Sequence, residues 1–286
     1  MTERSIVIIG LPGSGKTTFL AALWHLVMDD EDDTALRFHK LSVGDMAHLN
    51  RIAERWREAK EQDRTGIAGH KMVSMNLLDG NKMPVRVTFP DVPGEAYRRM
   101  WEDRECDPEI ADIMDAEGVL LFIHSDSIVS PSWVVDEVTL ARQLGIDVPK
   151  GQEVDWHPRL APTQVQIVDL LQLLCEPPLD VGPRRLAIML SAWDKAKREG
   201  LSPSDYIDAK LPLLGQYLRQ GVNGWTCQIY GISAQGGDYD PVEPDQMAKP
   251  QAELLRKLDR PSARISLING YNNSHDLTEP LAWLMQ

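Results

Sequence analysis

The first residues whose types and spacing suggest chemistry form the segment GLPGSGKT at positions 10–17, called the phosphate loop below. Gly10, Gly15, Lys16 and Thr17 match the pattern G-x-x-x-x-G-K-[ST]. An apolar run precedes the loop and a helical pattern follows it, which disfavours a plain glycine-rich turn. Glycines let the backbone wrap around phosphate oxygens, while the positive end of the helix faces the anion. The loop therefore predicts a site for a nucleoside triphosphate.

Each residue of the phosphate loop has an expected role. The backbone amides of residues 13–17 should face the phosphate groups. Lys16 should bridge the β- and γ-phosphates and support catalysis, and the Thr17 hydroxyl should bind Mg²⁺. The loop alone does not identify the reaction, because kinases, transport ATPases and GTPases share it. The nucleotide-binding residues that we expect here are Gly10, Pro12, Gly13, Ser14, Gly15, Lys16, Thr17 and Thr18.

A second motif, DVPG at positions 91–94, follows an expected strand at 85–89 and fits the pattern D-x-x-G. Asp91 should hold Mg²⁺ through a water molecule, and the Gly94 amide could donate to the γ-phosphate until hydrolysis releases it. An ordinary Asp-Pro-Gly turn is the alternative. Glu95 follows directly and could orient the attacking water, although its charge is unfavourable beside a phosphate unless a cation offsets it. We therefore expect slow hydrolysis that awaits a partner.

A third motif, SAWD at positions 191–194, follows an expected strand at 185–190, where GTPases carry [NT]-K-x-D. The Asp194 carboxylate can accept from the ring N–H and the exocyclic amine of guanine, and adenine has no matching pair of donors. This favours GTP over ATP. Ala192 stands in place of the lysine whose stem packs beside the base. Lys195 could cover the base from the next position or could be a solvated side chain.

A fourth motif, GISA at positions 231–234, ends the last strand of the expected parallel sheet and resembles an S-A-K loop. In this interpretation Ser233 belongs to the nucleotide site and the Ala234 amide reads the guanine oxygen. Gln235 stands where a lysine is expected. Small residues after a strand are common, so a plain turn is the alternative. Together the motifs predict GTP and GDP, with Mg²⁺, as the ligands.

Catalysis in such a site also needs a threonine that senses the γ-phosphate and completes the Mg²⁺ coordination. Thr65 is the best-placed candidate and Thr34 is the second, while a plain loop threonine is the alternative. Arg64, beside Thr65, could stabilise negative charge in the transition state or be exposed to solvent.

The order of these motifs, each at the end of a strand, resembles that of translation-factor-related GTPases over nearly the whole chain. The segments GLPGSGKTT, DVPGE and SAWDK and a terminal P-x-x-W-L helix (Pro280, Trp283, Leu284) resemble the bacterial double-GTPase families associated with conflict and antiphage gene clusters. This resemblance implies protein partners, such as an effector, an activating protein or a second GTPase, and a regulatory role. A nucleotide-binding subunit that does not hydrolyse is the main alternative, and an ATP-dependent kinase or motor is another.

Composition narrows the possible partners. The net charge is −13, with 43 acidic and 30 basic residues, which disfavours binding to a phosphate backbone, so we expect no nucleic-acid partner. Three cysteines without metal-ligand spacing suit a reducing compartment. No apolar run approaches the roughly 20 residues of a membrane span. We therefore expect a cytoplasmic protein without a membrane span, and the sequence does not indicate its oligomeric state.

The motifs must be positioned by an α/β fold of the P-loop GTPase type. We expect a single domain over residues 1–286, with insertions near 34–64, 125–161 and 236–274. The sheet should be mainly parallel and six-stranded, with one antiparallel edge strand, a hairpin around residues 79–81 and helices on both faces. Ligands of such sheets lie at the carboxyl ends of the strands, where all the motifs fall. The expected strands lie at 5–10, 70–78, 85–89, 118–124, 185–190 and 226–232, with a short further edge strand possible at 36–41. Among the expected helices are one near 134–144 and one over 204–219.

Overall fold

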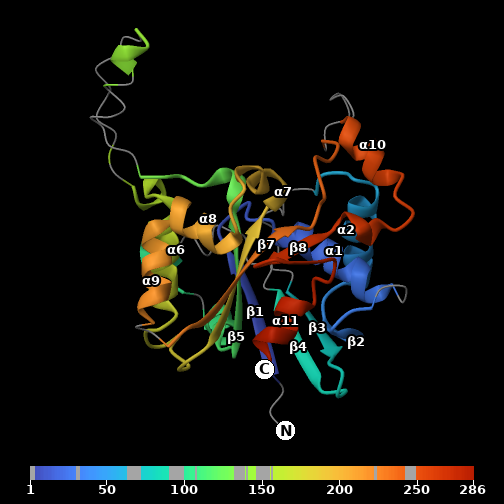
Figure 1. Cartoon of the computed structure of the whole chain (residues 1–286). Helices are drawn as coiled ribbons and strands as arrows, with labels where there is room; N and C mark the ends of the chain where they lie inside the picture. Colours follow the sequence, from blue (N-terminus) through green and yellow to red (C-terminus); the bar gives the residue numbers. More distant parts are fainter. Residues whose placement is uncertain are drawn as a thin grey trace.

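The computed structural model describes residues 4–29, 33–62, 72–89, 100–106, 108–131, 139, 141–145, 155, 157–221, 224–241 and 249–286. A single sheet of nine strands in the order β2-β3-β4-β1-β5-β6-β7-β8-β9 organises these residues (Figure 1). Its central strands are parallel to one another: β4 (Pro84–Phe89), β1 (Arg4–Gly10), β5 (Gly118–His124), β6 (Arg185–Ser191) and β7 (Thr226–Ser233).

Both margins of the sheet are antiparallel. β3 (Val73–Leu78) and β2 (Arg37–Val43) continue the sheet beside β4, whereas β8 (Ser266–Asn269) and β9 (Asn272–Ser274) continue it beside β7. The predicted fold class is confirmed, but the sheet has nine strands where we expected six, and two antiparallel margins where we expected one. The sequences SLIN and NNS of β8 and β9 explain why that hairpin was missed, because they are short and rich in asparagine and serine, which are poor strand formers.

The hairpin expected around residues 79–81 joins β3 to β4. The Asp79 carboxylate accepts from the backbone amides of Asn81 at 2.9 Å and Met83 at 2.7 Å. Aspartate is favoured in turns because its side chain can satisfy such nearby amides. The turn sets the register between β3 and β4.

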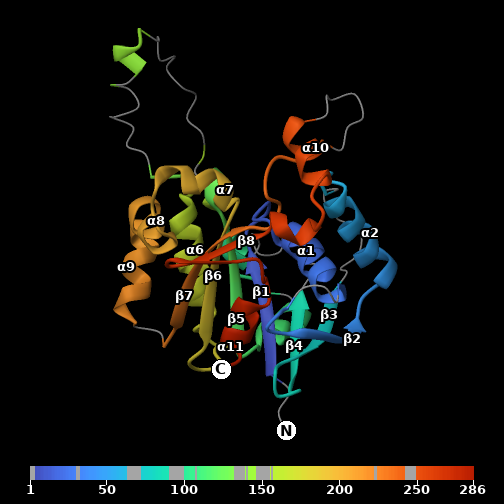
Figure 2. The same ribbon diagram turned by 45° about the vertical axis from the view of Figure 1, so that its right-hand side comes forward.

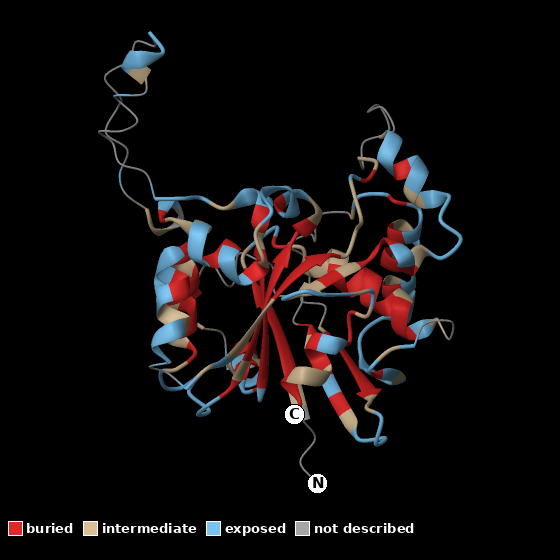
Figure 3. Cartoon of the chain, viewed as in Figure 1, coloured by how far each residue is buried: buried red, intermediate tan, exposed pale blue. Residues whose placement is uncertain are grey.

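Helices cover both faces of the sheet, as Figure 1 and Figure 2 show from two directions. Alternate residues of β1 divide between two cores, with Ile6 and Ile8 in one and Val7 and Ile9 in the other. Burial is concentrated along the strands and the inner sides of the helices (Figure 3). The first core includes residues of α1 (Lys16–Met28), α2 (Met46–Arg57), α10 (Pro250–Arg256) and α11 (Glu279–Leu284). The second core includes residues of α4 (Pro108–Met114), α6 (Thr163–Leu173), α7 (Trp193–Ala196), α8 (Pro203–Lys210) and α9 (Pro212–Gln220).

Helix α2 lies in the first expected insertion and packs on α1. Its N-cap residue Asp45 accepts from the Ala47 amide at 2.8 Å, which satisfies one of the free amides at the start of the helix. Between the two helices, Trp24 Nε1 of α1 donates to Asn50 Oδ1 of α2 at 2.9 Å. The insertion is therefore joined to the helix that follows the phosphate loop.

One helix was expected over residues 204–219, and the structure has two, α8 and α9. The break falls at Leu211 and Pro212. Proline lacks an amide hydrogen and its ring clashes with the preceding turn of a continuous helix. The helix expected near 134–144 falls mostly outside the described residues. None of the described helices has the length and apolar character needed to cross a membrane.

The contact between β7 and α7 gives a prediction about stability. A Cβ at Gly231 would lie 2.6 Å from Cε2 of Trp193, which is only 2% exposed. We expect Gly231→Ala to lower the free energy of unfolding by about 1–3 kcal/mol, because the buried ring must move to accommodate the methyl group. Urea unfolding would measure the change. The control is Gly80→Ala, since a Cβ at Gly80 meets nothing within 4 Å, and equal losses in both variants would contradict the prediction.

Candidate nucleotide-binding site

The phosphate loop leaves β1 at the carboxyl edge of the parallel strands. Gly10 has φ 153°, and a Cβ there would lie 2.7 Å from both the Phe122 carbonyl oxygen and Ser14 Oγ. Gly13 and Gly15 have φ 72° and 92°, in the left-handed region that favours glycine. The loop therefore needs its glycines for close approach at Gly10 and for backbone direction at Gly13 and Gly15.

Helix α1 begins at Lys16 with Gly15 as its N-cap, and no side chain caps it. The first turn, all of it described, contains no acidic residue. The free amides and the positive end of the helix dipole therefore face the loop, which is the arrangement that binds phosphate. Lys16 Nζ lies over the loop, where it donates to the Gly10 carbonyl at 2.6 Å and the Leu11 carbonyl at 3.1 Å.

Thr17 and Thr18 lie half-buried in this first turn, beside Lys16. Pro12 lies exposed at the tip of the loop. No cluster of three His, Cys, Asp or Glu side chains suited to a metal occurs among the described residues. Mg²⁺ usually takes few protein ligands and binds together with phosphates, so a single hydroxyl such as that of Thr17 fits the ion.

The first residue of the SAWD motif fastens the phosphate loop to β6. Ser191 Oγ donates to the Ser14 carbonyl at 2.8 Å, and a Cβ at Gly15 would lie 3.1 Å from the same Oγ. Ser191 is 8% exposed and Ser14 is 3% exposed, so this contact is shielded from water. Sequence reasoning missed this role, although the hydroxyl at the position of Asn or Thr in [NT]-K-x-D was a usable signal.

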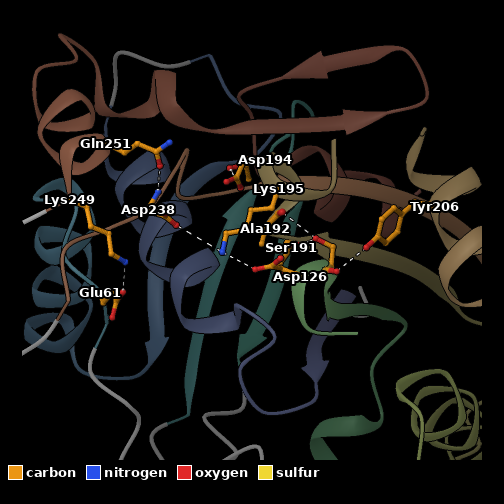
Figure 4. A network of polar contacts seen from close by, with 12 residues as sticks. Glu61, Asp126, Ser191, Ala192, Asp194, Lys195, Tyr206, Asp238, Lys249 and Gln251 are labelled. Carbon is orange, nitrogen blue, oxygen red and sulfur yellow. Dashed lines mark hydrogen bonds and ion pairs between the residues drawn. The ribbon is translucent and has the colours of Figure 1, made fainter. Parts of the chain in front are cut away.

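The Asp194 carboxylate lies where α7 begins, beside the end of β7 (Figure 4). Ala192, the N-cap of α7, has φ 53° and ψ 38°, which turns the chain sharply between β6 and α7. Asp194 Oδ1 accepts from Ser233 Oγ at 2.8 Å, and Ser233 Oγ accepts from the Gly236 amide at 3.1 Å. The structure thus brings together the two motifs that sequence reasoning assigned to the base.

The side chain of Lys195 lies between two carboxylates (Figure 4). Its Nζ is 2.8 Å from Asp126 Oδ2 and 4.0 Å from Asp238 Oδ1. The hydrogen bond between Lys195 and Asp126 raises the pKa of the lysine and lowers the pKa of the aspartate. Lys195 is exposed, and it forms ion pairs with both of these carboxylates. Its role of covering the base stays a prediction.

Ser125, after β5, supports the same turn. Its Oγ donates to the Ser191 carbonyl at 2.6 Å, and its own carbonyl accepts from the Tyr206 hydroxyl at 2.8 Å. These bonds connect β5, β6 and α8 beneath Asp194. On the other side of the site, the Ala234 carbonyl accepts from Trp56 Nε1 at 2.8 Å. Neither contact was foreseen from the sequence.

Comparison with models of protein families shows to which family the chain is related. The model of the Double-GTPase 1 family matches residues 7–284. The chain belongs to this family. The predicted resemblance to double GTPases is confirmed, and membership in the Double-GTPase 1 family supports a GTP-binding protein. A search of curated proteins finds no match.

Three solved structures similar to this Double-GTPase 1 member illustrate a distant likeness. Nucleolar GTP-binding protein 1 of Plasmodium falciparum is 15% identical with a TM-score of 0.39, and the match covers 89% of this chain and 84% of that one. The signal recognition particle receptor SRb-GTP/SRX complex of Chaetomium thermophilum is 14% identical with a TM-score of 0.41, covering 84% and 94%. The GTP-bound Ski7 GTPase-like domain of S. cerevisiae is 15% identical with a TM-score of 0.41, covering 89% and 50%.

The remaining expected site residues have different outcomes. Thr34, the second candidate for the γ-phosphate sensor, lies just before β2, and its hydroxyl donates to the Leu36 carbonyl at 2.8 Å. The other expected residues lie outside the described part of this Double-GTPase 1 chain, so their roles stay predictions: Arg64, Thr65, Asp91, Gly94 and Glu95.

The contact between Ser191 and Ser14 gives a prediction. Ser191→Ala removes the donor to the Ser14 carbonyl, so we expect GDP affinity to fall about 5- to 10-fold and stability to fall by about 1 kcal/mol. Isothermal titration and urea unfolding measure the two effects. Thr278→Val is the control, because Thr278 is fully buried and its Oγ1 accepts from the Leu36 amide at 3.0 Å. A loss of stability without a loss of affinity in Ser191→Ala would contradict the prediction.

Proposed function

We propose that this chain binds GTP and GDP with Mg²⁺, hydrolyses GTP slowly to GDP, and acts as a nucleotide-controlled switch for partner proteins. One observation carries the proposal: the phosphate loop and the paired Asp194 and Ser233 lie at one edge of the sheet, joined through Ser191. A nucleotide that reaches both would place its phosphates on α1 and its base at Asp194. A role in bacterial defence rests on the family resemblance alone.

Base selection is assigned to two groups. A carboxylate offers about four lone-pair sites, so Asp194 can keep its bond to Ser233 and still accept from the ring N–H and exocyclic amine of guanine. The Ala234 amide would donate to the 6-oxo group. Adenine presents the opposite pattern at these positions, which leaves buried polar groups unpaired and makes its binding unfavourable.

The phosphate side is assigned to the loop and to α1. The amides of residues 13–17 and Lys16 would hold the β- and γ-phosphates and stabilise negative charge as the bond to the γ-phosphate breaks. Thr17 and Asp91 would hold Mg²⁺, which neutralises charge on the phosphate oxygens. Glu95 would orient water, Thr65 and Gly94 would sense the γ-phosphate, and Arg64 would offset charge. We also assign the protein to the cytoplasm, with an effector, an activating protein or a second GTPase as partner.

Guanine recognition is tested with Asp194→Asn. The amide replaces one acceptor by a donor, so we expect GDP affinity to fall about 10- to 100-fold and affinity for xanthosine diphosphate, which has an oxygen in place of the amine, to rise. Competition against a fluorescent nucleotide measures both. Asp180→Asn, which changes a carboxylate that accepts from the Gly182 amide, is the control. Equal affinity of the unaltered protein for ADP and GDP would overturn guanine recognition.

Hydrolysis is tested by following phosphate release from GTP. We expect a turnover below about 1 s⁻¹ for the isolated protein and a lower turnover in the presence of EDTA. Lys16→Met should show no measurable turnover, because the lysine charge is removed from the phosphates. Lys210→Met is the control, since Lys210 pairs with Glu199 on the surface. Tight GTP binding with no GDP formed over many hours would favour the alternative of a non-hydrolysing subunit. Faster turnover of ATP would favour an ATP-dependent enzyme.

A further inference from the structure

The indole of Trp56 contacts three segments that are distant in sequence. Trp56 lies on α2 and is fully buried. Its Nε1 donates to the Ala234 carbonyl, 178 residues away, at 2.8 Å. The His25 ring of α1 has its centroid 5.1 Å from that of the indole, and the Arg264 guanidinium lies 4.6 Å from the ring centroid. An inserted helix thus contacts the loop to which base reading is assigned.

Arg264 holds Trp56 in place. The arginine is 6% exposed, and a buried guanidinium is unfavourable unless it finds hydrogen-bond acceptors. Its terminal nitrogens donate to the Trp56 carbonyl at 2.7 Å, to the Tyr239 hydroxyl at 3.1 Å and to the Leu255 carbonyl at 3.1 Å. These bonds fix the end of α2 against the C-terminal part of the chain, so the indole has little freedom to turn.

The base-reading loop, defined here as residues 233–236, is held from several sides. Gly236 has φ 79°, and a Cβ there would lie 2.7 Å from the Arg264 carbonyl oxygen. Ser233 is fixed by its bond to Asp194. Between them, the Ala234 carbonyl accepts from Trp56. That carbonyl belongs to the peptide that follows Ala234, whereas the Ala234 amide belongs to the peptide that precedes it. Ala234 is thus held at its own carbonyl and lies next to the anchored Ser233, which restricts the direction of the Ala234 N–H.

We propose that Trp56 is a positioning residue for base recognition: its indole N–H orients Ala234 so that the Ala234 amide meets the 6-oxo group of guanine. This inference rests on the proposed binding of guanine nucleotides and adds to it the inserted helix α2 as a determinant of specificity. Trp56 acts through Ala234 and is not itself assigned a contact with the nucleotide.

Other bonds hold the segment directly after α2, and with it the end of the helix, without the indole N–H. The Asp240 amide donates to the Ala59 carbonyl at 2.9 Å, and Arg256 Nε donates to the Glu58 carbonyl at 2.6 Å. Lys249 Nζ is 3.3 Å from Glu61 Oε1 (Figure 4). Loss of the indole N–H should therefore leave the position of α2 unchanged and affect only the orientation of Ala234.

The test compares Trp56→Phe with Trp24→Phe. Each variant keeps an aromatic ring and loses one indole N–H with a single acceptor on a neighbouring segment. The acceptor is the carbonyl of the half-buried Ala234 for Trp56, and Oδ1 of the exposed Asn50 for Trp24. The two tryptophans are 0% and 1% exposed, so the loss of packing is also matched. Only Trp56 contacts the base-reading loop through its N–H, which makes Trp24→Phe the control.

Two nucleotides separate positioning from general damage. GDP has the 6-oxo group. The diphosphate of 2-aminopurine riboside lacks this group and the ring N–H, but it keeps the exocyclic amine assigned to Asp194. We expect Trp56→Phe to lower GDP affinity about fivefold, the effect of about one neutral hydrogen bond, and to leave the affinity of the 2-aminopurine nucleotide unchanged. Trp24→Phe should leave the ratio of the two affinities as it is in the unaltered protein.

Several results would overturn the inference. An unchanged GDP affinity in Trp56→Phe, or an equal fall for both nucleotides, shows that Trp56 only stabilises the fold. If the unaltered protein does not prefer GDP to ADP, the proposed function itself fails, and that result is seen before any variant is made. If Trp56→Phe does not fold, the test instead measures the NMR resonance of the Trp56 indole N–H in the unaltered protein. That resonance should shift with GDP more than with the 2-aminopurine nucleotide, and equal shifts would contradict the inference.

Discussion

The parallel pairing of β1 with β5 and of β5 with β6 determines where the phosphate loop and Asp194 lie relative to each other. The register sets Gly10 beside Phe122 and His124 beside Ser191, so the loops after these three strands leave the sheet close together at one edge. Close packing at Gly10 and the bond from Ser191 then join the phosphate loop to the neighbouring strands. A change of register by one residue would reverse the faces of the side chains and separate the loop from Asp194.

Loops at strand ends have few contacts of their own, and here side chains from distant elements hold them. Ser191 supports the phosphate side, and Ser125 supports the turn before Asp194. Trp56 and Arg264 support the base side. Such supports hold binding groups in a fixed geometry before the ligand arrives, which lowers the entropic cost of binding. Helix α2 therefore belongs to the supports of the site.

Much of the fold could be predicted because its signals are local. The glycine loop between an apolar strand and a helix, the turn at Asp79 and the buried parallel strands all have patterns within a few residues. The break at Pro212 also had a local signal, which a reading that joined α8 and α9 overlooked. In contrast, β8 and β9 have too few residues and too many asparagines to show a strand pattern.

The supports of the site had no comparable signal. In the sequence, Trp56 resembles any other apolar residue on the buried face of α2, because a hydrogen bond to a distant carbonyl leaves no pattern along the chain. Arg264 resembles a surface arginine, because the burial of a guanidinium leaves no such pattern either. Ser191 was the exception, since it occupies the first position of the SAWD motif, where GTPases carry Asn or Thr. The residues that could be predicted are those that would touch the nucleotide, whereas those that position them required the structure.

The long sequence separations within the site also have a consequence for folding during synthesis. Ser191 lies 177 residues from Ser14, and Trp56 lies 178 residues from Ala234. Contacts of such high sequence separation form late, because closing the intervening chain costs entropy before the contact can stabilise it. A nascent chain that ends before Arg264 would therefore have a phosphate loop but an incompletely supported base side. Full nucleotide selectivity should then arise only after Arg264 has left the ribosome, well after the phosphate loop itself has been synthesised.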